Sequence, residues 1–235
     1  ICFALKKFKP HLVIHLAANV QTSHSSKNLK DIIDSNILFA TLILEAMKIC
    51  NIKNIINTGT YWQYQKKSYT PIALYAASKE AYEKILEFYV YNYDFRSITL
   101  ILFDVYGSND KRNKIVNYLL DCKDKKIKIN LNGGEQFFYP VHIDDVIMGF
   151  KLASEKIFKF RKSVHQKFTL RPNEKFKLKD FILIFQTVFD CKFKLNWLVP
   201  SKMNKPYLKD FKLSFTNLPR WSPKIKIKEG LKSLS

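Results

Sequence analysis

Two features are missing from this 235-residue sequence, and each absence argues against a class of protein. No run of about 18 or more apolar residues occurs, so the sequence predicts no membrane-spanning helix. No signal peptide is visible, and the cysteines have no metal-ligand spacing and no disulfide-framework pattern; they are Cys2, Cys50, Cys122 and Cys191. We therefore expect a cytoplasmic protein without a metal site and without membrane association.

Acidic residues are also scarce, since 20 Asp and Glu face 40 Lys and Arg, giving a formal charge of +20. Such a charge is compatible with nucleic acid, an anionic membrane surface or phosphorylated small molecules as partners. The lysines are dispersed, however, in segments such as "KDKKIKI" and "KFKLKD", where they alternate with apolar residues. Zinc-finger spacing, an RNP-like aromatic motif and a long basic tail are all lacking, so specific nucleic-acid binding is not expected.

The remaining pattern is an alternation of short apolar runs with longer amphipathic stretches. Strands are predicted at residues 11–18, 52–60 and 97–107, and helices at 29–50 and 73–93. This order is typical of a doubly wound α/β fold, in which helices cover both faces of a parallel sheet. The strands are almost continuously apolar, as strands buried on both faces should be. The length suits one globular domain with a possible smaller lobe.

The stretch "LYAASKEAYEKIL" places Tyr75 one helical turn before Lys79, so both side chains should share a helix face. Taken alone, Tyr-x-x-x-Lys is common by chance and usually means a half-buried ring beside a solvated ammonium. The surrounding motifs decide between the two interpretations.

Ligands of parallel α/β sheets bind beyond the carboxyl ends of the strands. Three short motifs, "LAAN" (16–19), "NTGT" (57–60) and "DVYG" (104–107), close predicted strands and should meet at that edge. Ala17, Ala18 and Gly59 would allow a ligand to approach the backbone closely, although tight helix packing explains each of them equally well.

These motifs, in this order, resemble the extended short-chain dehydrogenase/reductases, the NAD-dependent epimerase/dehydratases of nucleotide sugars. "HLAA", Asn36 in "DSNILFATLILEAMK", "IINTGT", "YAASK", "LFDVYG" and "GGEQFFYPVHIDDV" carry the resemblance, which covers nearly the whole chain. The wording of "NTGTYWQY" and "LFDVYG" is most similar to a branch that reduces a CDP-linked 4-keto sugar. The resemblance implies a Rossmann-type sheet, NAD or NADP as cofactor, a nucleotide-sugar substrate and a homodimer in the complete protein.

The resemblance also implies roles for individual residues. Tyr75 would be the catalytic acid and base, since a neighbouring cation favours its phenolate, and Lys79 would supply that cation. Thr58 would hydrogen-bond the reacting sugar oxygen, with Thr60 as the alternative for this role.

The cofactor would be bound by Leu16, Ala17, Ala18 and Lys79, and by Asn36, which could equally be an ordinary polar helix position. Asp104 and Arg171 are candidate substrate contacts, although Arg171 could instead pair with a surface carboxylate.

Two departures from the family concern phosphate binding. Many relatives carry Arg-Asp a few residues before the "VH" segment, where the Arg binds the pyrophosphate, whereas this chain has Phe138 and Tyr139. The usual Asn before "VYG" is Asp104. His142, Asp144 and Asp145 match a structural signature of the family, with Asp expected to cap the following helix.

The Gly-rich turn that opens the family sequence is absent, and residue 1 is Ile. We expect the first βαβ portion to be missing, through a truncated gene or a partial sequence. Residues 1–107 would form a partial NAD(P)-binding Rossmann domain, and residues 108–235 mainly a substrate lobe with segments that return to the sheet. Two interpretations remain: a nucleotide-sugar enzyme, or a non-catalytic remnant with a basic, polyanion-binding surface.

Overall fold

The computed structural model describes residues 1–21, 23–64, 71–125, 127–198 and 214–234. The chain forms two compact units. The first, called the sheet unit, comprises Ile1–Leu102, Met148–Leu170 and Phe211–Trp221; the second unit comprises Phe103–Ile147, Arg171–Asp210 and Ser222–Ser235. The predicted substrate lobe includes residues 199–213, which lie outside the described residues.

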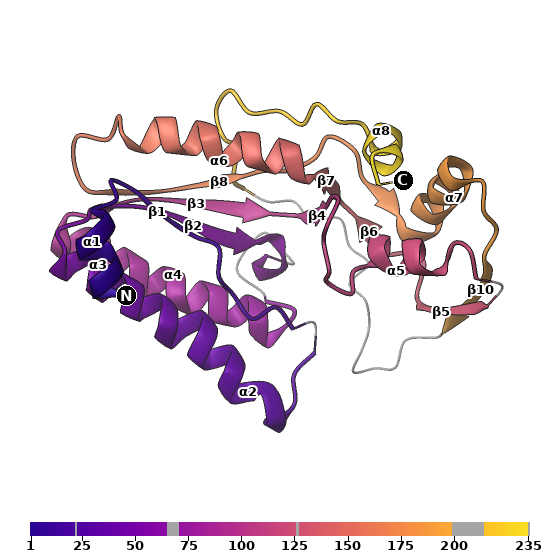
Figure 1. Ribbon diagram of the computed structural model, residues 1–235, viewed down its shortest axis with the longest axis horizontal. Coiled ribbons are helices and arrows are strands. Elements are labelled where there is room, and N and C mark those ends of the chain that lie inside the picture. Colours follow the sequence, from indigo (N-terminus) through magenta and orange to yellow (C-terminus); the bar gives the residue numbers. More distant parts are fainter. Residues whose placement is uncertain (22, 65–70, 126, 199–213, 235) are drawn as a thin grey trace. The chain divides into compact units, whose positions relative to one another are not determined.

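The sheet unit is built on four parallel strands in the order β1-β2-β3-β8 (Figure 1). These are β1 (Val13–His15), β2 (Asn54–Thr60), β3 (Arg96–Leu102) and β8 (Val164–Thr169). The central strands β2 and β3 are buried along nearly their whole length, as expected for strands of a parallel sheet covered on both faces. The predicted Rossmann-type parallel α/β fold is confirmed.

Helices of the sheet unit cover both faces of this sheet. They are α1 (Cys2–Phe8), α2 (Ser26–Ile33), the π-helical segment η1 (Asp34–Phe39), α3 (Ala40–Ile49), the 3-10 turn η2 (Tyr61–Gln63), α4 (Leu74–Tyr93) and, from Met148 on, α6 (Ile143–Ile157). In Figure 1, α3 and α4 lie on one face of the sheet and α6 on the other. Apolar side chains such as Leu44, Met47, Leu86 and Phe95 form the core beneath α3 and α4. Each fully buried side chain of this size contributes about 1.5 to 3 kcal/mol to folding.

The second unit contains three two-stranded sheets and three helices among its described residues. The pairs are β4 (Asp104–Tyr106) with β7 (Pro140–His142), β5 (Lys128–Asn132) with β10 (Lys194–Leu198), and β6 (Phe137–Phe138) with β9 (Phe176–Lys177). The helices are α5 (Ile115–Cys122), α7 (Leu178–Phe189) and α8 (Ile227–Lys232). Phe138 and Phe181, whose ring centroids are 4.5 Å apart, lie in its aromatic core.

Three predicted elements need correction. The strand predicted at 11–18 covers only Val13–His15, because only these residues have register partners in β2. The helix predicted at 29–50 is helical from Ser26 to Ile49 but contains the π-helical η1, which a 3.6-residue pattern does not reveal. The strand predicted at 97–107 is divided at Phe103 into β3, which joins the sheet, and β4, which pairs with β7 in the second unit.

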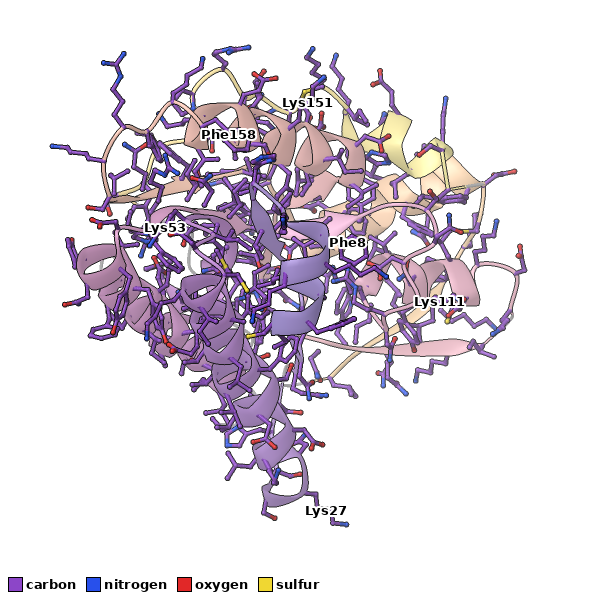
Figure 2. All side chains as sticks on the ribbon, turned by 60° about the vertical axis from the view of Figure 1, so that its left-hand side comes forward. Phe8, Lys27, Lys53, Lys111, Lys151 and Phe158 are labelled. Carbon is purple, nitrogen blue, oxygen red and sulfur yellow. The ribbon has the colours of Figure 1, made fainter. Side chains whose placement is uncertain are left out.

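No helix among the described residues is both long and apolar enough to cross a membrane. Two of the basic residues labelled in Figure 2, Lys27 of α2 and Lys151 of α6, lie on separate helices of the sheet unit. This dispersal agrees with the pattern of lysines in the sequence.

Candidate active site

Lys79 connects helix α4 to the end of strand β2. Its side chain is only 2% exposed, and its ammonium donates a hydrogen bond to Thr58 Oγ1 at 3.2 Å. The Thr58 hydroxyl in turn donates to the backbone carbonyl of His15 at 3.3 Å. One lysine and one threonine thus link α4, β2 and β1 at the carboxyl end of the parallel strands, where ligands of such sheets bind.

Tyr75 occupies the first turn of α4, one turn before Lys79. The helix begins at Leu74, three residues after Pro71, a residue that the helix interior does not tolerate. The Tyr75 side chain is half-buried, and its carbonyl accepts a hydrogen bond from Ser78 Oγ at 2.7 Å. Residues four apart share a helix face, so Tyr75 and Lys79 lie on the same side of α4.

Asn36 ties the first turn of α4 to the loop after β1. It lies in η1, and its side chain both accepts from the Asn19 amide at 2.7 Å and donates to the Asn19 carbonyl at 3.0 Å. The same amide group also donates to Ser78 Oγ at 2.9 Å. Asn36 is therefore a buried clamp between three segments and not an ordinary polar helix position, and π-helical segments are frequent at functional sites.

Ser78 is a member of this cluster that the sequence analysis did not identify. It stands between Tyr75 and Lys79 in "YAASK" and is 2% exposed. Its bonds to Asn36 and to the Tyr75 carbonyl hold the helix turn that carries the tyrosine. The signal in the sequence that could have identified Ser78 is its position as a small polar residue inside the "YAASK" motif.

Burial dominates the electrostatics around Lys79. It lowers the pKa of the ammonium to about 8, although the Glu83 carboxylate acts in the opposite direction. The lysine is therefore still largely charged at neutral pH. The pKa of His15 is lowered to about 4, mainly by burial and additionally by the Lys79 charge, so that this imidazole is neutral. The nearby Asn57 side chain acts in the opposite direction on the His15 pKa and is outweighed.

The other predicted residues of the sheet unit lie close in sequence to this cluster. Leu16 and Ala17, directly after β1, are exposed, whereas Ala18 is half-buried. Thr60 caps the turn η2, because its Oγ1 accepts from the Trp62 amide at 3.3 Å. Of the two threonines, it is Thr58 that hydrogen-bonds Lys79.

Asp104 and Arg171 belong to the second unit, where both contact Tyr139. Asp104 Oδ2 accepts from the Tyr139 amide at 2.8 Å, and the Arg171 guanidinium lies 6.0 Å from the Tyr139 ring centroid. Tyr139, which replaces the Asp of many relatives, is thus a buried support for both candidate substrate residues.

The cap predicted for α6 is formed by a different residue. Asp144 and Asp145 lie inside the first turn of α6, and His142 Nδ1 accepts from the Asp144 amide at 3.3 Å. Asp145 accepts from the backbone amides of Lys224 and Ile225, at 3.0 and 3.1 Å. The negative charges of both aspartates still interact favourably with the positive N-terminal end of the helix dipole. Asp145 also anchors the C-terminal segment.

The parallel sheet and the helix that carries the Tyr-x-x-x-Lys motif together define a protein of the Rossmann-type α/β class. A profile of the NAD dependent epimerase/dehydratase family matches residues 2–164, and the chain belongs to this family.

Curated proteins and solved structures are both similar to this chain. A CDP-abequose synthase of Yersinia pseudotuberculosis is 34% identical over 146 residues, 61% of this chain and 51% of the relative. The crystal structure of a UDP-glucuronic acid 4-epimerase from Bacillus cereus, in complex with UDP-glucuronic acid and NAD, superposes with a TM-score of 0.82 at 23% identity, covering 98% of this chain and 76% of the other. A UDP-glucose 4-epimerase from Thermotoga maritima, solved with UDP-glucose, gives a TM-score of 0.81 at 19% identity, with 99% and 80% coverage.

The chain spans about half the length of the curated relatives it matches, 51% of one CDP-abequose synthase and 57% of another. The solved structures share its fold, and their bound molecules are properties of those proteins.

Proposed function

We propose that this chain carries the acid/base part of an NAD(P)-dependent enzyme that acts on a nucleotide sugar, with Tyr75 as the proton-transfer group. The observation that carries the proposal is the hydrogen bond from the buried Lys79 ammonium to Thr58, one helical turn from Tyr75. Burying an ammonium group lowers the stability of the fold, so a buried lysine is more readily explained by a role in function. Perturbed pKa values also cluster at functional sites.

Each of the three residues has a separate chemical task. Tyr75 takes a proton from, or returns it to, a sugar hydroxyl while the attached carbon is oxidised or reduced. The Lys79 charge stabilises the Tyr75 phenolate, which is the form that takes up the proton and the form left after the proton is returned, because an opposite charge nearby favours the ionised form. Thr58 orients the sugar oxygen through its hydroxyl, which already accepts from Lys79 and can rotate toward a new partner.

The residues present also fit the nicotinamide end of NAD or NADP. A bound nicotinamide would supply the acceptor or donor of the hydride. Lys79 has three N–H donors and uses one on Thr58, so others are available for ribose hydroxyls. Leu16 and Ala17 are exposed directly after β1, the small Ala17 and Ala18 side chains cover little of the backbone there, and the Asn36 clamp fixes the loop that follows.

For the substrate, we infer a CDP- or UDP-linked hexose. The relatives favour this class: the matched curated proteins include CDP-abequose synthases and UDP-glucuronate 4-epimerases. Asp104 and Arg171, which belong to the second unit, stay candidate substrate contacts on the family resemblance alone. Between reduction of a CDP-linked 4-keto sugar and 4-epimerisation of a UDP-linked sugar, we propose the reduction first.

We infer that the chain associates with a second copy of itself. We also infer that it is located in the cytoplasm. Large apolar side chains on the sheet unit are exposed, among them Leu38 of η1, Leu42 of α3 and Phe88 of α4. Exposed apolar groups of this kind mark association surfaces. Sedimentation of the purified protein should give a dimer mass, and a monomer at micromolar concentration would contradict this part of the proposal.

The enzyme assignment is tested by hydride transfer. We would incubate a protein completed with the Gly-rich first βαβ portion with reduced NAD or NADP and a CDP-linked 4-keto sugar, and separately with NAD and UDP-glucuronate, while following nicotinamide absorbance and separating the products. Turnover of either substrate, lost in Lys79→Met, is expected. Absence of turnover with both substrate classes would contradict the proposal.

A non-catalytic, polyanion-binding role is the second candidate, favoured by one pocket. A cavity of about 660 Å³ in the sheet unit has four cations in its lining, Lys6, Lys9, Lys53 and Arg96, and no acidic side chain among its described lining residues. Lys53 and Phe158, two of the residues that line this cavity, are labelled in Figure 2. Salt-resistant binding of polyphosphate, abolished by Lys53→Ala with Arg96→Ala, would favour this role over catalysis.

A further inference from the structure

Glu83 is a buried carboxylate one helical turn beyond Lys79. It is 1% exposed, and its Oε1 lies 2.7 Å from Lys167 Nζ and 2.9 Å from His165 Nε2, both on strand β8. On its other ring nitrogen, His165 is 2.6 Å from Ser97 Oγ of β3. We call these four residues, Ser97, Glu83, His165 and Lys167, the Glu83 cluster.

Charged groups face Glu83 from two elements. On α4, Lys79 precedes it, and the Glu80, Lys84 and Glu87 side chains share the neighbouring positions. On β8 stand His165 and Lys167, and Lys167 also donates to Tyr64 Oη at 3.0 Å. Burial would raise the pKa of the Glu83 carboxyl, but the hydrogen bonds and charges of His165 and Lys167 outweigh it and lower this pKa, so Glu83 is ionised.

Two direct roles for the cluster conflict with its surroundings. The order Ser97, His165, Glu83 is that of a nucleophile, a base and an orienting carboxylate, but Ser97 is 0% exposed, so no substrate can reach its hydroxyl. Glu83, Glu87 and His165 could together offer three metal ligand atoms within 4.8 Å of one another. Lys167 and Lys84, however, already pair with the two carboxylates, and an ammonium beside each carboxylate disfavours a further cation.

The remaining charged neighbour is Lys79, which lies four residues before Glu83 and so on the same face of α4. Among the described residues, Glu83 is the charged group that acts on the Lys79 ammonium against the effect of burial. Its own position is fixed from outside the helix, by two side chains of β8.

We propose that Glu83 is a positioning residue for Lys79: anchored by His165 and Lys167, its carboxylate keeps the Lys79 ammonium charged and directed to Thr58. Without this carboxylate, the described residues would leave the buried ammonium without a compensating charge, and a neutral amine cannot stabilise a phenolate. The catalytic consequence rests on the proposed function of Tyr75 and Lys79, whereas the effect on Lys79 itself does not.

The test is a titration of Lys79 in the 235-residue chain. Lysine labelled with ¹³C at Cε reports each ammonium by NMR, and the Lys79 signal is assigned with Lys79→Met. In Glu83→Gln the Lys79 midpoint should fall by about one pH unit, because an opposite charge next to a cation is removed. Glu87→Gln, one turn further along α4 and paired with exposed Lys84, is the matched control and should leave the midpoint unchanged.

A second variant separates positioning from packing. Glu83→Gln leaves the Lys167 ammonium without its carboxylate and is expected to lower stability, whereas Glu83→Gln with Lys167→Met removes both charges and should recover it. The Lys79 midpoint should remain low in this double variant. An unchanged midpoint in both Glu83 variants would overturn the proposal.

Turnover provides an independent reading. In the active protein, the pH dependence of kcat in Glu83→Gln should shift by the same amount and in the same direction as the Lys79 titration. If kcat falls without any change of its pH profile, the positioning role is wrong. A wild-type protein without turnover would contradict the proposed function, while the NMR comparison still decides the role of Glu83.

Discussion

The ammonium of Lys79 donates to the hydroxyl of Thr58 across 3.2 Å, with both side chains buried between helix α4 and strand β2. A solvated lysine beside a tyrosine would make no such contact. The relationship turns a common four-residue spacing into a specific charged site at the carboxyl end of the sheet.

Lys79→Met should make the folded chain more stable at neutral pH. The folded pKa of about 8 lies below the ordinary value of 10.5, so the unfolded state binds the extra proton between these values. The stability that Lys79 contributes therefore rises with pH from about 8 to 10.5. Below pH 8, Met should be favoured by roughly 1 to 3 kcal/mol, from about 1.4 kcal/mol per pKa unit.

Urea unfolding of wild type and Lys79→Met at a series of pH values measures this difference. The gap between the two free energies of unfolding should close as the pH approaches 10.5. A variant that is less stable than wild type at pH 7 would show that the lysine is structural.

His15 should cause part of the acid sensitivity of the fold. Its folded pKa, about 4, is below the ordinary 6.5, so the unfolded state takes up the proton first and stability is lost as the pH falls from about 6.5 toward 4. His15→Phe removes this contribution, worth up to about 3 kcal/mol, and places an aromatic ring in the space beside Tyr82. Thermal unfolding at pH 7 and pH 4.5 compares the two proteins; an equal loss of stability in both would contradict the assignment.

Asn36→Ala should destabilise the chain by about 2 to 4 kcal/mol, because it breaks one buried and two partly buried hydrogen bonds and leaves backbone groups of Asn19 without this partner. Asn92→Ala, which removes one exposed bond to the Phe88 carbonyl, is the control and should change stability by less than about 0.5 kcal/mol. Equal effects of the two substitutions in chemical denaturation would argue against the clamp.

The high positive charge should not confer specific DNA binding. Because the lysines are dispersed, duplex DNA should bind weakly and be released by about 200 mM salt. Fluorescence anisotropy of a labelled duplex over a salt series measures this. Sequence-selective binding that persists at physiological ionic strength would reverse the ranking of partners.

The sequence predicts the parallel sheet and its helices well, because strands buried on both faces and long amphipathic helices have distinct periodicities. It predicts boundaries less well where pairing decides them: Leu16–Ala18 are as apolar as Val13–His15 but have no register partner in β2. The π-helical turn at Asn36 likewise depends on its contacts with Asn19 and Ser78.

The candidate site divides in the same way. Tyr75, Lys79 and Thr58 belong to motifs that the sequence displays, and Lys79 does bond Thr58. The Glu83 cluster could not be predicted, because Glu83 and His165 are 82 residues apart and meet only when α4 packs on β8. Which of two threonines faces the lysine is also a property of the fold, since both follow the same strand pattern.

The catalytic role of Tyr75 is tested most directly by Tyr75→Phe. The substitution removes one phenolic oxygen and leaves the helix, Lys79 and Thr58 in place. In a protein completed with the first βαβ portion, we predict that the variant loses at least about 100-fold in turnover of the nucleotide sugar, the usual contribution of a proton-transfer group, while NAD binding is retained. Tyr91→Phe, on the same helix with 78% of its side chain exposed, should be fully active. Wild-type turnover in Tyr75→Phe would contradict the account.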